Sequence, residues 1–333
     1  MKAVQIENYS ESIKTVLSNI PIPQIGDTEI LIKVKAAAVN PLELLILTGK
    51  IKLIQDYPMP LTLGNECSGI IEEVGKKVVG FQKGDRVYGL LPLEKIGAFA
   101  EYVKVDQKVI SKMPMGYDFT TAVAIPLSGL TAYQGIIEEL RAKAGETLFI
   151  AGGSGSFGEM AVPLAKKFGL RVIISGNERS KDRFLAMGVD QYINYKNENY
   201  WEVLSDVDYI IDTLGDREFE HELSVLKRGG TLLSLKTAPN KEFAIKREFS
   251  FLKRLLFTIA GKKYDKLAQR QGKKYRFMFV QANGVQLKKI TQIVEENHIK
   301  PTIDSRIFSI EQVNEALRLV SEGNINGKVI IQM

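Results

Sequence analysis

The sequence predicts an α/β protein that joins a β-rich part to a doubly wound parallel sheet. The first ~120 residues contain β-branched runs, several with period-two alternation, separated by turn residues. After residue 146, apolar runs alternate with helical patterns of roughly 10–15 residues, as in βαβ units. A glycine-rich turn follows the first of these runs. With 333 residues, the chain is long enough for two domains with cores of their own.

The strands expected in the first part are short and follow one another closely. They are "KAVQI", "EILIKVKAAAV", "CSGIIEEVG", "DRVYGLL" and "AFAEYVKV". Turn segments such as "PQIGD" and "KKVVGFQKGD" separate them. This succession, with few helical patterns, indicates an antiparallel β domain.

The second part opens with helical segments in "TTAVAIPLSGLTAYQGIIEEL". Its expected strands are "TLFIA", "RVIIS", "QYINY", "DYIIDTLG", "GTLLSLK" and "YRFMFV", with helices between most of them. The tail from residue 284 contains two amphipathic helical patterns and a final strand. We expect this tail to return to the first domain.

Composition narrows the class of protein. The net charge is +6, but residues 246–276 hold 11 Lys and Arg against 2 acidic residues, so this segment carries +9 and the rest −3. The single cysteine, Cys67, excludes a disulfide framework and favours a reducing, cytoplasmic location. No signal-type segment opens the sequence, and no apolar run approaches the ~18 residues of a membrane span.

The turn "AGGSGSFG" fits one of two phosphate-binding templates. A P-loop needs Lys and Ser or Thr after its second glycine, whereas Glu159 and Met160 follow here. The dinucleotide template needs glycines at its first, third and sixth positions, and Gly153, Gly155 and Gly158 satisfy it. The expected backbone cradle for a pyrophosphate is Ser154, Gly155, Ser156 and Phe157, at a helix N-terminus. A merely flexible connection is the alternative.

Two features near this turn modify the prediction. Asn177 lies 19 positions after Gly158, where an NAD site carries an acid for the ribose hydroxyl. Its neutral side chain, with Arg179, Ser180 and Lys181 close by, favours NADP(H) and its 2′-phosphate. An ordinary solvated helix start is the alternative, which Glu178 supports. Pro163, inside the expected helix, should remove a hydrogen bond or kink it.

Taken together, the motifs resemble the medium-chain dehydrogenase/reductase superfamily, in its zinc-free quinone oxidoreductase and enone reductase branch. They are "AAAVNPLELLILTGK", "YPMPLTLGNECSGIIEEVG", "GFQKGDRVYG", "IPLSGLTAYQGI", the glycine turn, "YINY" and the terminal "GKVII". The resemblance implies a GroES-like β-barrel catalytic domain over residues 1–122 and 281–333, around a Rossmann NADP(H)-binding domain over 123–280. It also implies NADPH as cofactor, a quinone or enone acceptor, and a homodimer joined near "YRFMFV".

The resemblance also assigns individual residues. Those expected to contact the cofactor are Asn40, Thr131, Tyr195, Leu214, Gly215, Phe279, Val280 and Lys328. Tyr195, Lys328 and Asn40 each have an ordinary alternative, as a strand tyrosine, a surface charge and a turn cap. The family often has an aromatic residue five positions after the asparagine, where this chain has Leu45.

Zinc-dependent relatives carry cysteine and histidine where this chain has Asn40 and Asn65, so the pattern predicts no metal site. Zinc alcohol dehydrogenase is therefore the rejected alternative. Reduction without a metal needs an activated acceptor, such as a quinone or an enone, and hydrogen bonds to the developing oxyanion. Tyr57 and Tyr133 are possible donors of those bonds, although either could be a core aromatic. No residue is identified as the general acid, and Cys67 is expected to be a buried residue without catalytic use.

The basic segment has several interpretations. It could be a lid that attracts the anionic cofactor, or a contact with an anionic membrane or nucleic acid. A helical excursion with a solvated basic face is the simplest alternative. A non-enzymatic NADPH-binding protein that contacts nucleic acid through residues 246–276 is therefore the second functional hypothesis, although nucleic acid is not the expected partner.

Overall fold

The computed structural model describes residues 1–333, and the chain forms two compact units. Unit 1 combines Met1–Leu130 with Gln281–Met333, and unit 2 comprises Thr131–Val280. The first junction falls later than the 122/123 position suggested by the sequence. Val123 explains part of the difference, because it is buried with Ala36, Ala38 and Ile330 of unit 1.

Unit 1 is built on β-structure. Its main sheet has the order β15-β16-β3-β5-β6-β8, with β7 paired to β3, and a second sheet has the order β2-β1-β4. The strands are β1 (Lys2–Ile6), β2 (Val16–Asn19), β3 (Glu29–Val39), β4 (Leu61–Thr62), β5 (Glu66–Val74), β6 (Arg86–Leu90), β7 (Tyr102–Asp106), β8 (Ile110–Lys112), β15 (Ile303–Ser309) and β16 (Lys328–Gln332). All pairs are antiparallel except β15 with β16.

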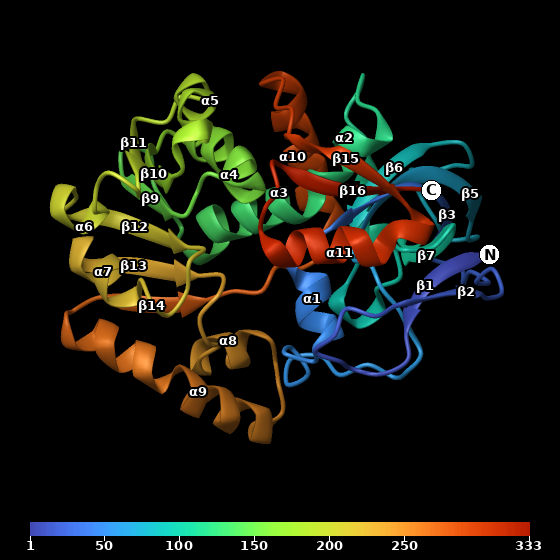
Figure 1. Ribbon diagram of the computed structural model, residues 1–333, viewed down its shortest axis with the longest axis horizontal. Coiled ribbons are helices and arrows are strands. Elements are labelled where there is room, and N and C mark those ends of the chain that lie inside the picture. Colours follow the sequence, from blue (N-terminus) through green and yellow to red (C-terminus); the bar gives the residue numbers. More distant parts are fainter. The chain divides into compact units, whose positions relative to one another are not determined.

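The C-terminal tail completes the main sheet of unit 1 (Figure 1). Strand β16 pairs with β3 in an antiparallel register that sets Val329 opposite Val39. The helices of this unit are α1 (Pro41–Leu47), α2 (Phe119–Val123), α10 (Gly284–Glu296) and α11 (Val313–Glu322), while α3 (Pro126–Tyr133) spans the junction. Helix α11 packs on β15 and β16 through one apolar face.

Unit 2 is a parallel, doubly wound sheet with the order β11-β10-β9-β12-β13-β14. Its strands are β9 (Thr147–Ala151), β10 (Arg171–Gly176), β11 (Gln191–Asn194), β12 (Val207–Asp212), β13 (Leu226–Ser234) and β14 (Lys274–Phe277). The sequence-based prediction of an α/β fold with this kind of sheet is therefore confirmed. The central strands β9 and β12 are almost entirely buried, as expected for a sheet covered on both faces.

The helices of unit 2 are α4 (Ser156–Lys167), α5 (Lys181–Ala186), α6 (Tyr200–Val203), α7 (Phe219–Val225), α8 (Lys241–Lys246) and α9 (Phe251–Arg270). A π-helical segment, Gln134–Glu139, precedes the sheet. Helices α8 and α9 pack on each other and on β14, the edge strand (Figure 1). Pro163 is accommodated inside α4, which runs on to Lys167 and stops before Gly169, whose φ is +75°.

Candidate functional site

The glycine turn joins the end of β9 to the start of α4. A Cβ atom on Gly158 would lie 1.7 Å from the carbonyl oxygen of Gly153, so the helix packs against the turn at a distance that only glycine allows. A Cβ atom on Gly155 would meet no atom within 4 Å. The turn is therefore closed by Gly158 and open toward solvent at Gly155.

Gly152, which the sequence template does not include, makes the tight turn after β9. Its φ is +72°, and a Cβ atom there would lie 2.5 Å from the Leu214 side chain. Its N–H donates to Ser175 Oγ at 2.9 Å. The left-handed conformation thus falls one residue before Gly153, which lies in the same turn and is crowded against Ile150.

The first turn of α4 is suited to an anion. Its N-cap residue is Gly155, which has no side chain to accept a hydrogen bond from the N–H groups of the first turn. The helix is 12 residues long, and its dipole places a partial positive charge at the N-terminus, where those N–H groups lie. The backbone of the turn can therefore bind a phosphate group.

Asn177 follows β10 and reaches back to the glycine turn. Its Nδ2 lies 3.4 Å from Ser154 Oγ, and its Oδ1 accepts from the backbone N–H of Ser180 at 3.1 Å. Tyr192 donates to the Asn177 carbonyl at 2.5 Å. The structure thus brings Asn177, Ser154 and Ser180 together at the carboxyl edge of the sheet.

The cations near Asn177 differ in their surroundings. Arg183, six positions after Asn177, forms an ion pair of 2.8 Å with the buried Glu159. Arg179 is exposed and Lys181 half-buried. Tyr195 is 58% exposed and directly follows the last residue of β11, Asn194. Asn194 is in register with Gly176, the last residue of β10, so Tyr195 lies at the same edge of the sheet as Asn177. Arg179, Lys181 and Tyr195 are thus nearby side chains that are at least partly exposed.

Leu214 and Gly215 lie on the loop after β12, beside the glycine turn. Asp212 holds this loop, because its Oδ1 accepts from the N–H groups of Leu214 at 2.6 Å and Gly215 at 2.7 Å. Its Oδ2 accepts from Ser234 Oγ at 2.5 Å. Asp212, which sequence reasoning did not single out, therefore positions the loop.

Glu222 on α7 makes the stability of unit 2 depend on pH. Burial, together with the neighbouring Asp212, raises the pKa of its carboxyl to about 10. A carboxyl whose pKa is higher in the folded than in the unfolded chain stabilises the fold below pH ~4 and loses that contribution as pH rises toward the folded pKa. We expect Glu222→Gln, which stays neutral, to raise the melting temperature at pH 8 to 9 by several degrees. At pH 5 the two melting temperatures should nearly coincide.

Thermal unfolding followed by circular dichroism at pH 5, 7 and 9 checks this expectation. Glu220→Gln is the matched control, because Glu220 lies on the same helix and is exposed. Equal melting curves for Glu222→Gln and the parent chain at pH 9 would show that the buried carboxyl does not limit stability.

Unit 1 contains a buried polar network around Asn40. Lys328 Nζ lies 2.6 Å from Asn40 Oδ1 and 3.2 Å from Glu66 Oε2. Asn40 Nδ2 donates to Glu66 Oε2 at 3.1 Å, and the other Glu66 oxygen accepts from the Leu127 N–H at 2.7 Å. All three side chains are at least 95% buried. A lysine ammonium is therefore the cation that these oxygens hold.

Glu43 holds the backbone on which the network residue Asn40 is carried. Its carboxylate accepts from the backbone N–H of Asn40 at 2.7 Å and of Asn65 at 3.1 Å. Burial raises the pKa of Glu43 to about 8, against the lowering effect of the hydrogen bond from Asn40. Asn40 also accepts from the first turn of α1 in a capping box with Glu43. The sequence motif around Asn40 includes Glu43, but its spacing alone does not reveal this role.

The remaining predicted residues lie outside these two clusters. The Tyr57 hydroxyl donates to the Leu93 carbonyl at 2.6 Å, so its proton is already engaged. Tyr133 packs edge-on against Phe168 in unit 2. Thr131 is buried on α3, while Phe279 and Val280 follow β14 and are half-buried. The Phe279 carbonyl accepts from Arg247 Nη2 at 3.0 Å.

Cys67 and the side chains that could bind a metal ion are the remaining candidates for functional groups of the site. Cys67 is fully buried on β5, and burial raises the pKa of its thiol to about 12. No group of three or more His, Cys, Asp and Glu side chains is arranged to hold a metal ion. No helix combines the length and the apolar character needed to cross a membrane.

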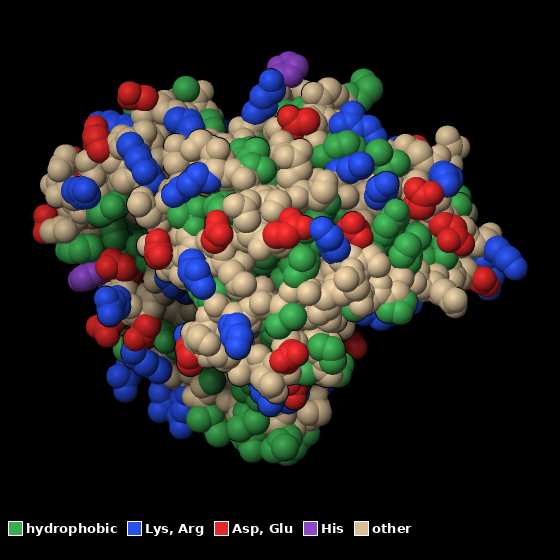
Figure 2. Space-filling view, turned by 45° about the vertical axis from the view of Figure 1, so that its right-hand side comes forward, with side chains coloured by type: hydrophobic (Ala, Val, Ile, Leu, Met, Phe, Trp, Pro, Cys, Tyr) green, Lys and Arg blue, Asp and Glu red, His purple; other side chains and the backbone are tan.

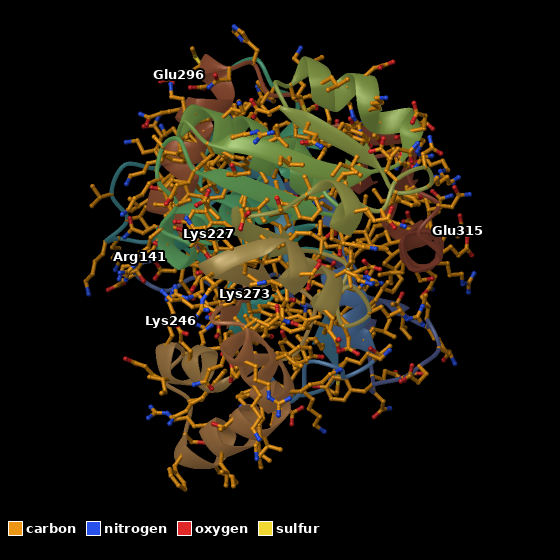
Figure 3. The ribbon with its side chains drawn as sticks, turned by 90° about the vertical axis from the view of Figure 1, so that its left-hand side faces the viewer. Arg141, Lys227, Lys246, Lys273, Glu296 and Glu315 are labelled. Carbon is orange, nitrogen blue, oxygen red and sulfur yellow. The ribbon has the colours of Figure 1, made fainter.

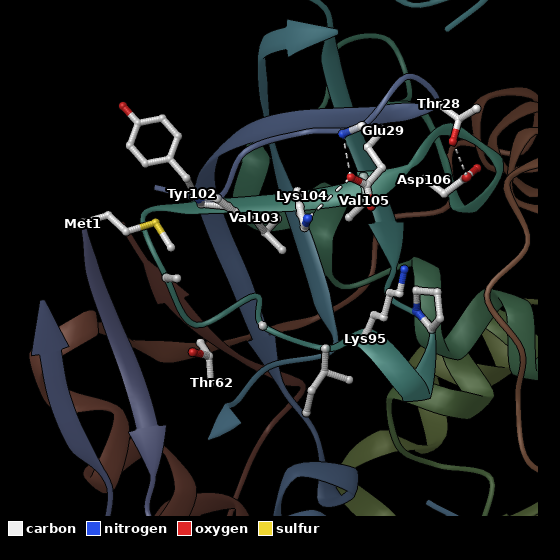
Figure 4. A pocket seen from close by; sticks show the side chains of 16 residues that line it. Met1, Thr28, Glu29, Thr62, Lys95, Tyr102, Val103, Lys104, Val105 and Asp106 are labelled. Atoms are coloured by element: carbon white, nitrogen blue, oxygen red, sulfur yellow. Dashed lines mark hydrogen bonds and ion pairs between the residues drawn. The ribbon is translucent and has the colours of Figure 1, made fainter. Parts of the chain in front are cut away.

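A hollow of about 630 Å³ opens on unit 1 (Figure 4). Glu29 and Lys104, which line it, form an ion pair of 3.5 Å, and Thr28 donates to Asp106 at 3.1 Å. The hydrogen bond from the Gly26 N–H lowers the pKa of Glu29, and the positive charge of Lys104 lowers it to a smaller extent. The hollow contains none of the predicted site residues.

The fold and the two clusters define a two-unit α/β protein with a Rossmann-type sheet and a GroES-like β domain. Residues 26–115 match the alcohol dehydrogenase GroES-like domain family, and residues 187–331 match the zinc-binding dehydrogenase family. The 2-methylene-furan-3-one reductase of Solanum lycopersicum is 30% identical over 341 residues, which cover 99% of this chain and 79% of that protein.

Two further comparisons agree. The NADPH-dependent alkenal/one oxidoreductase of Arabidopsis thaliana, named as chloroplastic, is 28% identical over 94% of this chain and 74% of that protein. The solved quinone oxidoreductase of Coxiella burnetii superimposes with a TM-score of 0.84 at 27% identity, covering 100% of this chain and 99% of that one. The chain belongs to the medium-chain dehydrogenase/reductase superfamily, in its zinc-free quinone oxidoreductase and enone reductase branch.

Proposed function

We propose that this protein is an NADPH-dependent oxidoreductase that reduces a quinone or an α,β-unsaturated carbonyl compound without a metal. The observation that carries the proposal is the glycine turn, whose helix N-terminus lacks a side-chain cap and is followed by the neutral Asn177. The relatives named as an NADPH-dependent alkenal/one oxidoreductase and a quinone oxidoreductase support it.

The residues of unit 2 fit the dinucleotide. The open space at Gly155 and the N–H groups of the first turn of α4 would receive the pyrophosphate. Asn177, Arg179 and Tyr195 would surround the 2′-phosphate. The loop of Leu214 and Gly215, which Asp212 holds, would contact the ribose. When bound, NADPH supplies a hydride to an electron-poor carbon of the acceptor.

The network of unit 1 supports reduction without zinc. Asn40 and Asn65 lack the thiolate and imidazole that bind zinc, so the residues present do not suit the metal named in one family description. We propose that Lys328 and Asn40 instead form a fixed polar group that orients the reactants. Thr131, Phe279 and Val280 remain proposed cofactor contacts.

An acceptor series tests the proposed function directly. Oxidation of NADPH, followed by absorbance, is measured with simple ketones, quinones and enones, and the whole series is repeated with NADH. We expect turnover of quinones or enones, little turnover of unactivated ketones, and preference for NADPH. If the folded protein binds NADPH but turns over none of these acceptors, the proposal is contradicted. The result would then favour the hypothesis of a non-enzymatic NADPH-binding protein.

Asn177→Asp should change the choice of cofactor. An aspartate can still accept from the Ser180 N–H, so the loop is retained, but its charge repels a 2′-phosphate. We expect kcat/KM for NADPH to fall about ten- to a hundredfold, with NADH much less affected. Asn199→Asp, at an exposed position of the same unit, adds the same charge as a control. An unchanged ratio of the two kcat/KM values would exclude Asn177 from the phosphate site.

Two details of the assembly are also proposals. A homodimer would use β14, because this strand is the edge of the unit 2 sheet and has unpaired backbone groups to offer. Light scattering on the purified protein would measure the oligomer. A cytoplasmic location rests on the single cysteine, and the chloroplastic name of one relative shows that the branch is not confined there.

A further inference from the structure

Helix α9 is attached to unit 2 through one face only. Its buried residues are Phe257, Gly261, Tyr264 and Ala268, which recur every three or four positions. A Cβ atom on Gly261 would lie 2.4 Å from Asn240, so the helix is seated closely at this point. Tyr264 donates to Asp216 at 2.9 Å. These contacts fix which side of α9 faces away from the sheet.

The first half of the opposite side is apolar. Its exposed fractions are Phe251 84%, Leu252 66%, Leu255 48%, Leu256 41% and Ile259 63%. At ~100° per residue, these five side chains centre on the direction opposite to the buried face. Figure 2 shows apolar side chains gathered at the lowest part of the view, where α9 begins. Large apolar side chains gathered in this way on a surface mark an interaction site.

The second half of the same side is cationic. Lys262, Lys266 and Arg270 are spaced by four residues, are exposed and form no ion pair. Other cations of the basic segment are already neutralised: Lys263 pairs with Asp216, and Lys246 pairs with Glu139. Lys246, labelled in Figure 3, therefore contributes less to the free positive charge than the exposed side of α9.

We propose that this outer face of α9, defined as the five apolar and three cationic residues named above, binds an anionic lipid surface. The apolar half enters the boundary between headgroups and acyl chains, and the cationic half meets lipid phosphates. The helix lies on the membrane without crossing it, because its 20 residues are not apolar enough to span. The inference does not depend on the proposed reductase activity.

The composition of the outer face argues against other occupants. Five partly exposed side chains present less area than the ~800 Å² that each partner buries in a stable dimer. A nucleic-acid surface would combine its cations with stacking aromatic residues, whereas four of the five apolar residues here are aliphatic. Charge complementarity and the aliphatic composition together select anionic lipid.

Flotation of the full-length protein with vesicles tests this inference. Vesicles of phosphatidylcholine alone are compared with vesicles containing 30 mol% phosphatidylserine, at low and high salt. We expect at least a tenfold larger bound fraction on the anionic vesicles at low salt, and a marked reduction at high salt. Absence of binding to anionic vesicles at low salt by folded protein would overturn the proposal.

Two variants separate the contributions of the outer face. Leu252→Ser/Leu255→Ser/Ile259→Ser should lose binding, and Lys262→Glu/Lys266→Glu should lose the preference for anionic lipid. Val79→Ser and Lys300→Glu, at exposed positions of unit 1, are the matched controls and should bind like the parent chain. Binding by the triple variant equal to that of the parent would overturn the proposal.

The same samples exclude the competing occupants. Light scattering shows whether the triple variant changes the oligomeric state, and a gel shift shows whether the chain binds single-stranded RNA. A lost oligomer without vesicle binding by the parent chain would identify a second copy as the occupant and overturn the lipid proposal. RNA binding without vesicle binding would overturn it in favour of nucleic acid.

Discussion

Lys328→Met is expected to destabilise unit 1 by about 3 kcal/mol and to abolish most of the reductase activity. The ammonium is buried, and it is the cation beside the fully buried carboxylate of Glu66 at 3.2 Å. Removing it leaves Glu66 with hydrogen bonds from Asn40 and Leu127 but with no countercharge. Urea unfolding measures the loss of stability, and NADPH oxidation with a quinone measures the loss of activity.

The double variant Lys328→Met/Glu66→Gln separates stability from function. Neutralising the carboxylate should recover much of the lost stability, because no buried charge is then left unpaired. Activity should not recover, because the cation beside Asn40 is still missing. Full recovery of activity in the double variant would contradict a functional role for Lys328.

An exposed ion pair provides the matched control. Lys83 and Glu72 are 2.6 Å apart and their side chains are 70% and 41% exposed. Lys83→Met should leave unfolding and activity unchanged within error, since water solvates either charge alone. If Lys328→Met were as mild as Lys83→Met, burial would not be the source of the effect.

Gly158→Ala is expected to cost 2–3 kcal/mol or more of stability, with at least a tenfold loss of NADPH affinity. The added methyl carbon would lie 1.7 Å from the Gly153 carbonyl oxygen, which is backbone and cannot rotate away. Helix α4 would have to shift off the turn, and its first N–H groups would shift with it. Thermal unfolding and titration of NADPH by fluorescence measure the two effects.

Gly155→Ala is the informative partner, because it keeps the fold and changes the space for the ligand. The Cβ atom would meet nothing within 4 Å, and φ at this position is −100°, which alanine adopts freely. We expect an unchanged melting temperature together with weaker NADPH binding. Tight binding by Gly155→Ala would place the pyrophosphate away from the first turn of α4.

Local patterns in the sequence were sufficient for much of the fold. The βαβ alternation predicted the parallel sheet of unit 2, and the spacing of Gly153, Gly155 and Gly158 identified the turn before α4. These predictions concern residues close in the chain, for which hydrogen-bond and hydrophobic periodicity decide the local structure. The return of the tail to the first domain is expected from the tail's own pattern, and the family resemblance implies the same arrangement.

Backbone conformation and long-range packing were not predictable in the same way. Gly152 takes the left-handed conformation and lies against the loop after β12, and the template includes neither feature. In the sequence, nothing distinguishes Asp212, at the end of β12, or Glu222, on α7, from other acidic residues. Their importance follows from burial, which the sequence pattern does not report.

The sequence by itself determined the class of this protein: the family, the Rossmann-type sheet, the glycine turn, and the amide side chains where zinc ligands would stand. Only the tertiary structure decided what accompanies Asn40, because Lys328 is 288 positions away in the chain. The antiparallel register of β16 with β3 places Val329 opposite Val39, and so brings the ammonium beside the amide. Pairing between distant strands depends on the whole buried face of the sheet, and no local pattern contains it.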